Sequence, residues 1–235
     1  MTVEPRSYLT HLECGLTGET YAAGELHGLL RAGRPLLARY DLAVLGDAVT
    51  RETFAARPAT LWKWRELLPL ANWGNRIELG EEATPILPLA RTAARLDAET
   101  LLVKDEGRLP TGSFKARGLA VALSMARELG VAKIAMPTNG NAGAAAAAYA
   151  AAAGIEAVIF APEETPEINI REIAAYGARV YRVTGRSTIA ASWSRRARTA
   201  RAGSTCPPLR NRTGSKARRR WGWSSPSNSA GGCPT

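Results

Sequence analysis

Apolar and polar residues alternate in a repeated strand–helix pattern from about residue 100 onward. Short apolar runs predict strands at 101–103, 131–136, 155–161 and 178–183. Intervening stretches predict helices at 116–129, 141–153 and about 165–176, the last capped by Thr165, and each ended by a glycine (Gly130, Gly154 and Gly177). This alternation predicts parallel βαβ units in an open α/β sheet, which binds ligands at the carboxyl ends of its strands.

The first hundred residues carry weaker patterns. Residues 11–42 predict a short two-stranded flap, and residues 59–70 predict a half-buried helix that contains Trp62 and Trp64. Both tryptophans are expected to pack in the core rather than to stack on nucleic-acid bases. We therefore expect an N-terminal flap over residues 1–50, an α/β region over residues 51–185 and a tail over residues 186–235.

The charge distribution separates the tail from the rest of the chain. The net charge is +10, but residues 186–235 hold ten Arg, one Lys and no Asp or Glu, which leaves 20 basic and 21 acidic residues in residues 1–185. The tail is also rich in Ser, Gly and Pro and lacks the strand–helix pattern, which is typical of disorder. A nearly neutral body of this kind does not have the surface of a nucleic-acid-binding domain.

The most distinctive stretch runs from Pro110 to Gly118 and reads PTGSFKARG. It places Lys115 at the start of a predicted helix, where the positive end of the helix dipole makes an ammonium lose its proton more easily. An amine in this state can form a Schiff base with a carbonyl cofactor. Gly112 permits a close approach of the backbone to a ligand.

The neighbours of this lysine support the same interpretation. The acidic pair Asp105-Glu106 comes just before the stretch. Ser113 offers a helix cap and a hydroxyl, and Phe114 supplies apolar cover. Arg117 lies two positions beyond the lysine, where its charge opposes protonation of the amine.

A second loop, Thr138-Asn139-Gly140-Asn141-Ala142-Gly143, joins a predicted strand to a predicted helix. A glycine-containing turn at the start of a helix presents unbonded N–H groups and is suited to an anion. The side-chain amide of Asn141 can hydrogen-bond a phenolate-type oxygen. Many α/β proteins contain such a turn, so the loop gains its significance from the lysine stretch that precedes it.

Together, the two stretches resemble the lysine motif and the Ser/Thr-x-Gly-Asn-x-Gly loop of pyridoxal-phosphate enzymes, and within these the chain is most similar to threonine synthases. The segment Glu82-Ala83-Thr84-Pro85-Ile86 resembles the entry segment of the same fold, with Thr84 near the cofactor cleft. The resemblance covers roughly residues 9–190. It implies a tryptophan-synthase-β-like α/β fold (fold type II) with open parallel sheets, of which residues 51–185 are the partial catalytic region.

The resemblance also implies the cofactor, pyridoxal 5′-phosphate, and the roles of the site residues. Lys115 would hold the cofactor and move protons during the reaction. Phe114 and Asn141 would contact the cofactor as well. The residues implied to bind the substrate are Ser113, Thr138, Asn139, Gly140, Asn141 and Ala142. The implied reaction converts O-phospho-L-homoserine and water into L-threonine and phosphate, and the implied assembly is a homodimer.

Metal ions and membranes are not expected to be partners. Many threonine synthases carry paired zinc-binding Cys-x-x-Cys knuckles near the N-terminus, but here Thr17 stands where Cys14 would have its partner. A structural zinc site needs about four N or S ligands, and this segment does not supply them, so no zinc site is expected. The chain has no run of 18 apolar residues, we expect no signal peptide at its start, and its three scattered cysteines fit a reducing cytoplasm.

Two other functions are compatible with parts of the pattern. A sibling enzyme, such as a serine/threonine dehydratase or cysteate synthase, shares the lysine and carboxylate loops; the Lys-Ala-Arg-Gly run and the Leu-Glu-Cys start favour threonine synthase. A non-enzymatic nucleic-acid binder would use the basic tail, with Trp221 and Trp223 stacking on bases.

The tail has a third interpretation, namely translation in the wrong frame. Read one nucleotide earlier with freely chosen wobble bases, residues 211–231 can be rewritten into strings that resemble the threonine synthase segment expected after residue 185. A frameshift there would remove the family's phosphate-cradling loop and the partner of the pyridine nitrogen. We therefore expect a truncated, inactive chain.

The coding DNA around codon 185 tests this interpretation. We expect that a shift of one nucleotide restores a reading frame whose product continues the threonine synthase pattern. An intact frame with no such alternative would contradict the frameshift.

Overall fold

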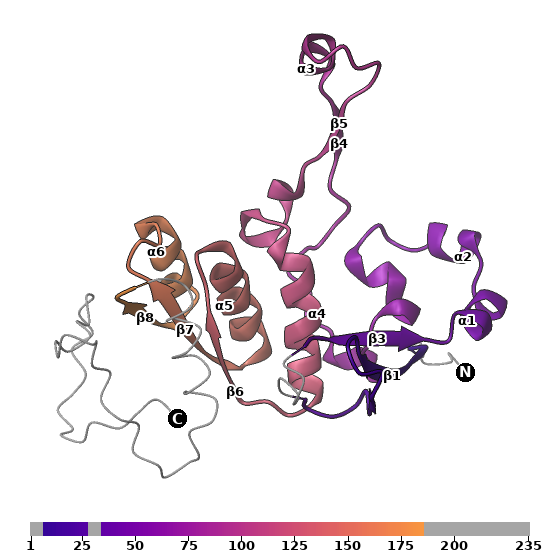
Figure 1. Cartoon of the computed structure of the whole chain (residues 1–235), viewed down its shortest axis with the longest axis horizontal. Coiled ribbons are helices and arrows are strands. Elements are labelled where there is room, and N and C mark those ends of the chain that lie inside the picture. The colour runs from indigo at the N-terminus through magenta and orange to yellow at the C-terminus, as the bar shows by residue number, and fades with distance from the viewer. Residues whose placement is uncertain (1–6, 28–33, 186–235) are drawn as a thin grey trace. The chain divides into compact units, whose positions relative to one another are not determined.

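The computed structural model describes residues 7–27 and 34–185, and the chain divides into two compact units between Val131 and Ala132. Each unit is described by itself, with the element labels of Figure 1. This boundary falls inside the region predicted for residues 51–185. None of the helices in the described part of the chain combines the length and the apolar character needed to cross a membrane.

The first unit begins with an antiparallel sheet of three strands in the order β2-β1-β3. Its strands are β1 (Leu9–Cys14), β2 (Thr20–Tyr21) and β3 (Leu36–Tyr40). The prediction of a two-stranded flap was therefore wrong by one strand. The two-residue strand β2 is too short to show an alternating pattern in the sequence, and it pairs with Leu12 and Glu13 of β1.

Short helices and turns follow in the first unit. They are α1 (Leu42–Ala48), α2 (Arg51–Ala55), α3 (Ala90–Arg95) and the 3₁₀ helices Leu61–Leu67, Trp73–Asn75, Glu106–Arg108 and Pro110–Gly112. The predicted helix over residues 59–70 is thus a 3₁₀ helix. Trp62 is buried in it as expected, but Trp64 is 42% exposed, so its predicted core position was wrong. Trp64 instead packs against Phe54 at the surface.

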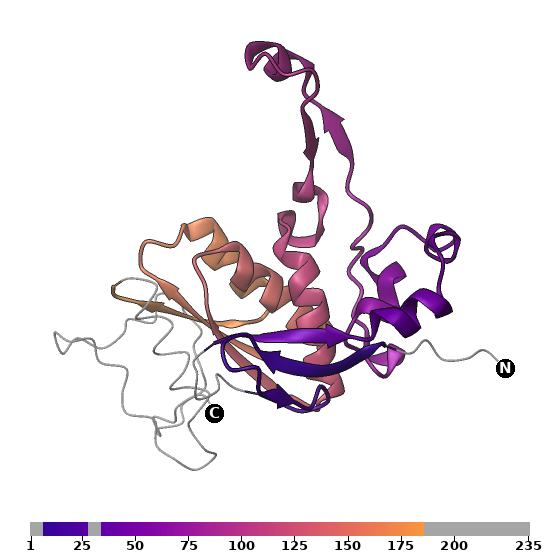
Figure 2. The same cartoon turned by 45° about the vertical axis from the view of Figure 1, so that its right-hand side comes forward.

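The strands β4 (Ile86–Pro88) and β5 (Leu102–Lys104) pair with each other in an antiparallel ribbon. Figure 2 shows this ribbon with α3 beyond its end. The sequence predicted the strand at residues 101–103 as a member of the parallel sheet, and this assignment was wrong. The unit closes with α4 (Lys115–Glu128), whose end is marked by the left-handed Gly130 as predicted.

The second unit is the predicted parallel α/β sheet, which is confirmed. Its order is β6-β7-β8, with β6 (Lys133–Pro137), β7 (Glu156–Pro162) and β8 (Arg179–Val183). The helices α5 (Asn141–Ala153) and α6 (Glu167–Ala175) connect them and lie side by side along the sheet (Figures 1 and 2). Their ends are formed by Gly154 and Gly177 with positive φ, but Pro166, not Thr165, precedes α6 as its N-cap.

Small side chains allow α5 to lie deep within this unit. Residues 143–150 are one glycine, six alanines and Tyr149, and all of them are buried. Ile159 of β7 and Ile173 of α6 are fully buried as well. An alanine-rich helix can approach a sheet closely, and this close approach fixes where its N-terminus lies.

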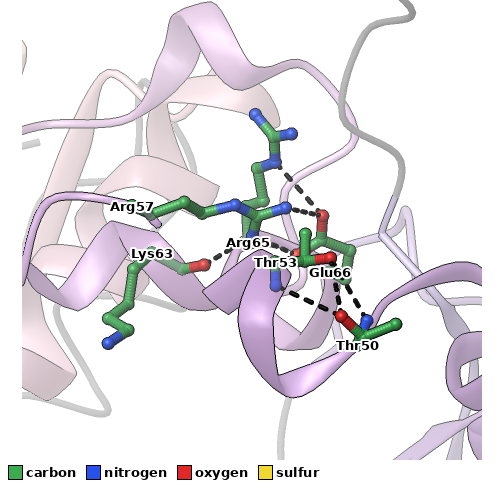
Figure 3. Close-up of polar contacts among 6 residues, drawn as sticks. All are labelled: Thr50, Thr53, Arg57, Lys63, Arg65 and Glu66. Atoms are coloured by element: carbon green, nitrogen blue, oxygen red, sulfur yellow. Dashed lines mark hydrogen bonds and ion pairs between the residues drawn. The ribbon is translucent and has the colours of Figure 1, made fainter. Parts of the chain in front are cut away.

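A buried ion pair organises the first unit near α2 (Figure 3). The Arg57 guanidinium donates to both carboxylate oxygens of Glu66 at 2.7 Å, and Arg65 Nε donates to Glu66 Oε1 at 3.2 Å. Burial raises the pKa of the Glu66 carboxyl, but hydrogen bonds from Arg57 and Arg65 outweigh this effect and hold the pKa below its ordinary value. Arg57 also donates to the carbonyl of Lys63 at 2.6 Å, which fixes the 3₁₀ helix.

Replacement of the buried partner is expected to destabilise this unit. Glu66→Gln leaves the largely buried Arg57 charge without its counter-ion, so the free energy of unfolding should fall by roughly 1.5–3 kcal/mol in urea titrations. The matched control is Glu13→Gln, which breaks the exposed pair with Arg39 and should cost less than about 1 kcal/mol. Equal losses in the two variants would contradict the assigned role of burial.

Candidate functional site

The turn before α4 has an unusual backbone. Thr111 and Gly112 have successive positive φ values of 62° and 64°, and Ser113 is extended. Nothing lies within 4 Å of a Cβ built on Gly112, so its left-handed conformation, and not lack of space, requires glycine there. A non-glycine residue such as Thr111 in this region is strained, and strain of this kind is typical of functional turns.

Lys115 is the first residue of α4, as the sequence predicts. Its Nζ atom lies 4.4 Å from the centre of the Phe114 ring. The ring is 60% exposed, so Phe114 presents an apolar face beside the amine at the surface of its unit. The predicted cap was wrong: Phe114 is the N-cap residue, and α4 has no side-chain cap.

Ser113 has a different position from the predicted one. Ser113 is buried, and its Oγ atom has no hydrogen-bond partner among the described residues. The Thr111 hydroxyl in the same turn shares this property. A buried hydroxyl without a partner is costly, and such atoms are typical of sites that a ligand or water completes.

Arg117, the other charged residue of this first turn, is paired with Glu106. Its Nε atom donates to Glu106 Oε2 at 2.7 Å, and its Nη2 atom donates to Glu106 Oε1 at 3.0 Å. Hydrogen bonds from Arg117 and Thr84 lower the pKa of the Glu106 carboxyl to about 2. Because this value lies below the ordinary 4.5, the pair stabilises the fold at neutral pH, and this contribution is lost as the pH falls through that interval.

In the second unit, Thr138 shapes the loop between β6 and α5. Its Oγ1 atom accepts hydrogen bonds from the N–H groups of Gly140, at 3.0 Å, and Gly143, at 2.8 Å. The hydroxyl also donates to the Gly140 carbonyl at 3.0 Å. The Thr138 side chain therefore organises the loop from within, whereas Asn139 is exposed.

The start of α5 has no side-chain cap. Gly140 is its N-cap residue, with φ 144°, and its carbonyl accepts from the N–H groups of Gly143 and Ala144. The amides of Asn141 and Ala142 precede this first helical hydrogen bond, which makes them the free donors of the helix start. Asn169 of α6 covers the loop: its Nδ2 atom donates to Asn141 Oδ1 at 3.4 Å, and Gly140 leaves room for it.

The predicted site residues thus form two groups. Ser113, Phe114 and Lys115 lie together in the first unit, and Thr138 to Ala142 lie together in the second. Sequence reasoning missed the roles of Glu106 and Asn169. The acidic pair ahead of the lysine stretch was the available signal for Glu106. Asn169 gave no such signal, because its partner Asn141 is 28 residues away in the chain.

These residues fit a carbonyl cofactor with anionic groups. An amine stands at an open helix start in the first unit, beside an unpartnered hydroxyl. In the second unit, a 13-residue helix begins with free amides next to an asparagine side chain. An amine can bind a carbonyl covalently, and amides at a helix start can bind a carboxylate or phosphate.

Comparison with known proteins gives the class. Residues 77–221 match the model of the pyridoxal-phosphate dependent enzyme family, and the chain belongs to this family. The fold class and the cofactor predicted from the sequence are thereby confirmed. The match continues into residues 186–221, which lie outside the described residues, and the frameshift remains a prediction.

Individual relatives of this chain include threonine synthases. The chain is 33% identical over 173 residues to threonine synthase of Methanocaldococcus jannaschii, which is 73% of this chain and 43% of the relative. It is 31% identical over 177 residues to threonine synthase of Methanosarcina acetivorans, which is 74% of this chain and 43% of that relative. The chain therefore spans less than half the length of these relatives. A solved O-ureido-L-serine synthase is 30% identical, with a TM-score of 0.41 and 47% of this chain and 37% of that chain covered.

Gly143 is expected to be required for the packing of the loop against Thr138 and Ile173. A Cβ there would lie 2.6 Å from Thr138 Cγ2 and 2.9 Å from Ile173 Cδ1, so Gly143→Ala should destabilise the second unit by about 1–3 kcal/mol. The matched control is Gly118→Ala in α4, where nothing lies within 4 Å, and a gain of about 0.5–1 kcal/mol is expected. Urea unfolding of both variants measures the difference; a stabilising Gly143→Ala would contradict this packing.

Proposed function

We propose that this chain carries the cofactor lysine of a threonine-synthase-type enzyme. The enzyme uses pyridoxal 5′-phosphate to convert O-phospho-L-homoserine and water into L-threonine and phosphate. The observation that carries the proposal is the position of Lys115 at an uncapped helix start behind a strained turn. The 33% identity to a threonine synthase supports the choice of reaction. A homodimer in the cytoplasm belongs to the same proposal.

Lys115 has two tasks in this proposal. Its Nζ atom binds the cofactor, and the same amine later takes and returns protons at Cα and Cβ of the substrate. The cofactor, when bound, supplies an electron sink for the charge that develops at these carbons. The exposed ring of Phe114 covers one side of the amine and limits the access of water.

The loop from Thr138 to Ala142 binds the substrate carboxylate in this proposal. The amides of Asn141 and Ala142 are free, and the dipole of α5 favours a negative charge at this end. Thr138 holds the loop in shape, because its hydroxyl is bonded to Gly140 and Gly143. Asn141 Oδ1 accepts from Asn169, so the Asn141 Nδ2 group would be the donor to the phenolate oxygen of the cofactor.

Addition of pyridoxal 5′-phosphate to the purified chain tests the cofactor lysine. After borohydride reduction, peptide mass mapping should find the cofactor on Lys115, and Lys115→Ala should remove this label. The matched control is Lys63→Ala, because Lys63 also lies over an aromatic ring, with its Nζ atom 4.9 Å from the Trp64 ring centre. A label spread evenly over the lysines, or retained in Lys115→Ala, would contradict the assignment.

A further inference from the structure

An exposed asparagine precedes a glycine in the loop between β6 and α5. Asn139-Gly140 is the one Asn-Gly pair in the chain, and Asn139 is exposed, so solvent reaches its side-chain amide. Asparagine is among the thermally labile residues. It is most labile before glycine, because glycine has no side chain to shield its backbone nitrogen from the neighbouring amide carbon.

The reaction open to this pair is deamidation. The Gly140 nitrogen loses its proton to hydroxide and bonds to Cγ of Asn139. The bond from Cγ to Nδ2 breaks, and the nitrogen leaves as ammonia after it takes a proton from water. A second water molecule then opens the five-membered imide at either of its two carbonyl carbons, which leaves an aspartate or an isoaspartate. The solvent supplies every reagent, and nothing is oxidised or reduced.

The conformation of Gly140 requires a glycine after this asparagine. Its φ of 144° and ψ of −105° lie in a region that residues with a side chain rarely adopt. A Cβ at this position would also lie 3.1 Å from Cγ of Asn169. The shape of the loop therefore keeps the glycine, and with it the labile pair.

The Thr138 hydroxyl holds the nitrogen that would react. The Gly140 N–H donates to Thr138 Oγ1 at 3.0 Å, and the hydroxyl donates to the Gly140 carbonyl at 3.0 Å. Thr138 is 5% exposed, and Gly140 is buried as well. A buried N–H that is already hydrogen-bonded can lose its proton to solvent only after the loop opens and this bond breaks.

We propose that Asn139 is a deamidation site whose rate is set by the Thr138 hydroxyl. While the hydroxyl holds the Gly140 N–H, the reaction is slow, and it accelerates when this bond is lost. The product adds a negative charge to the loop beside the start of α5. In the proposed function, on which this consequence alone rests, the added charge opposes binding of the substrate carboxylate.

Two replacements of Thr138 separate its hydroxyl from its shape. Thr138→Val keeps the size and the branching of the side chain but cannot bond to Gly140. Thr138→Ser keeps the hydroxyl and loses only the methyl group, which lies next to Gly143. Asn139→Gln is the matched control for the reacting group, because its longer side chain would have to close a less favourable six-membered ring.

The measurement is incubation of the purified chain at mildly alkaline pH, followed by rapid digestion and mass spectrometry of the peptide that contains Asn139. Asn141 in the same peptide is the internal reference, because it precedes Ala142 and should stay intact. The same incubation in urea gives the rate in the unfolded chain. We expect Asn139→Gln to show no reaction at this position.

The hydroxyl should decide the order of the rates. We expect Asn139 in the folded wild type to react at least about tenfold more slowly than in the unfolded chain. Thr138→Val should react about five- to tenfold faster than wild type, the factor that corresponds to one net hydrogen bond. Thr138→Ser should stay within about twofold of wild type, because it keeps that bond.

Circular dichroism shows whether each variant is folded. If Thr138→Val does not fold, wild type and Thr138→Ser are compared with the unfolded chain, and both should react at least about tenfold more slowly. Equal rates in the folded and unfolded wild type, or a folded Thr138→Val that reacts no faster than Thr138→Ser, would overturn the proposal. Deamidation requires no cofactor, so failure of pyridoxal 5′-phosphate to attach to Lys115 would contradict the proposed function separately.

Discussion

The open starts of two helices are the feature on which the candidate site depends. Neither α4 nor α5 has a side-chain cap, although α1 and α2 are both capped by their preceding residues. An uncapped start leaves N–H groups and a positive dipole end available, which suits a negatively charged ligand. The same openness removes the local support of the helix, so the support must come from elsewhere.

Each of the two starts obtains that support differently. At α5, the Thr138 hydroxyl bonds to the loop from inside, and the alanine-rich helix is buried so closely that Gly143 has no room for a Cβ. At α4, Glu106 and Arg117 supply an ion pair across 11 residues. Packing therefore supports the start of α5, whereas an ion pair supports the start of α4.

Much of the second unit was predictable because its signals are local. The apolar runs of β6, β7 and β8, the alanine content of α5 and the two helix-ending glycines, Gly154 and Gly177, are properties of neighbouring residues. Where the determinants are distant, prediction failed. Ser113 is of the usual capping type, yet it lies buried in an extended conformation, because the turn at Thr111 and Gly112 places the helix start one residue later. Trp64 follows an apolar pattern but packs on Phe54 at the surface.

The sequence by itself determined the class of this protein. The residues around Lys115 form one continuous stretch of sequence, and the loop from Thr138 to Gly143 forms another. In both stretches, glycines and small polar residues indicate the backbone conformation that is needed. Only the tertiary structure decided what surrounds the lysine. Arg117 could have opposed protonation of the amine, but Glu106 and Thr84 bind its guanidinium. Pairings of this kind follow from how distant segments meet in space, and no local pattern in the chain specifies them.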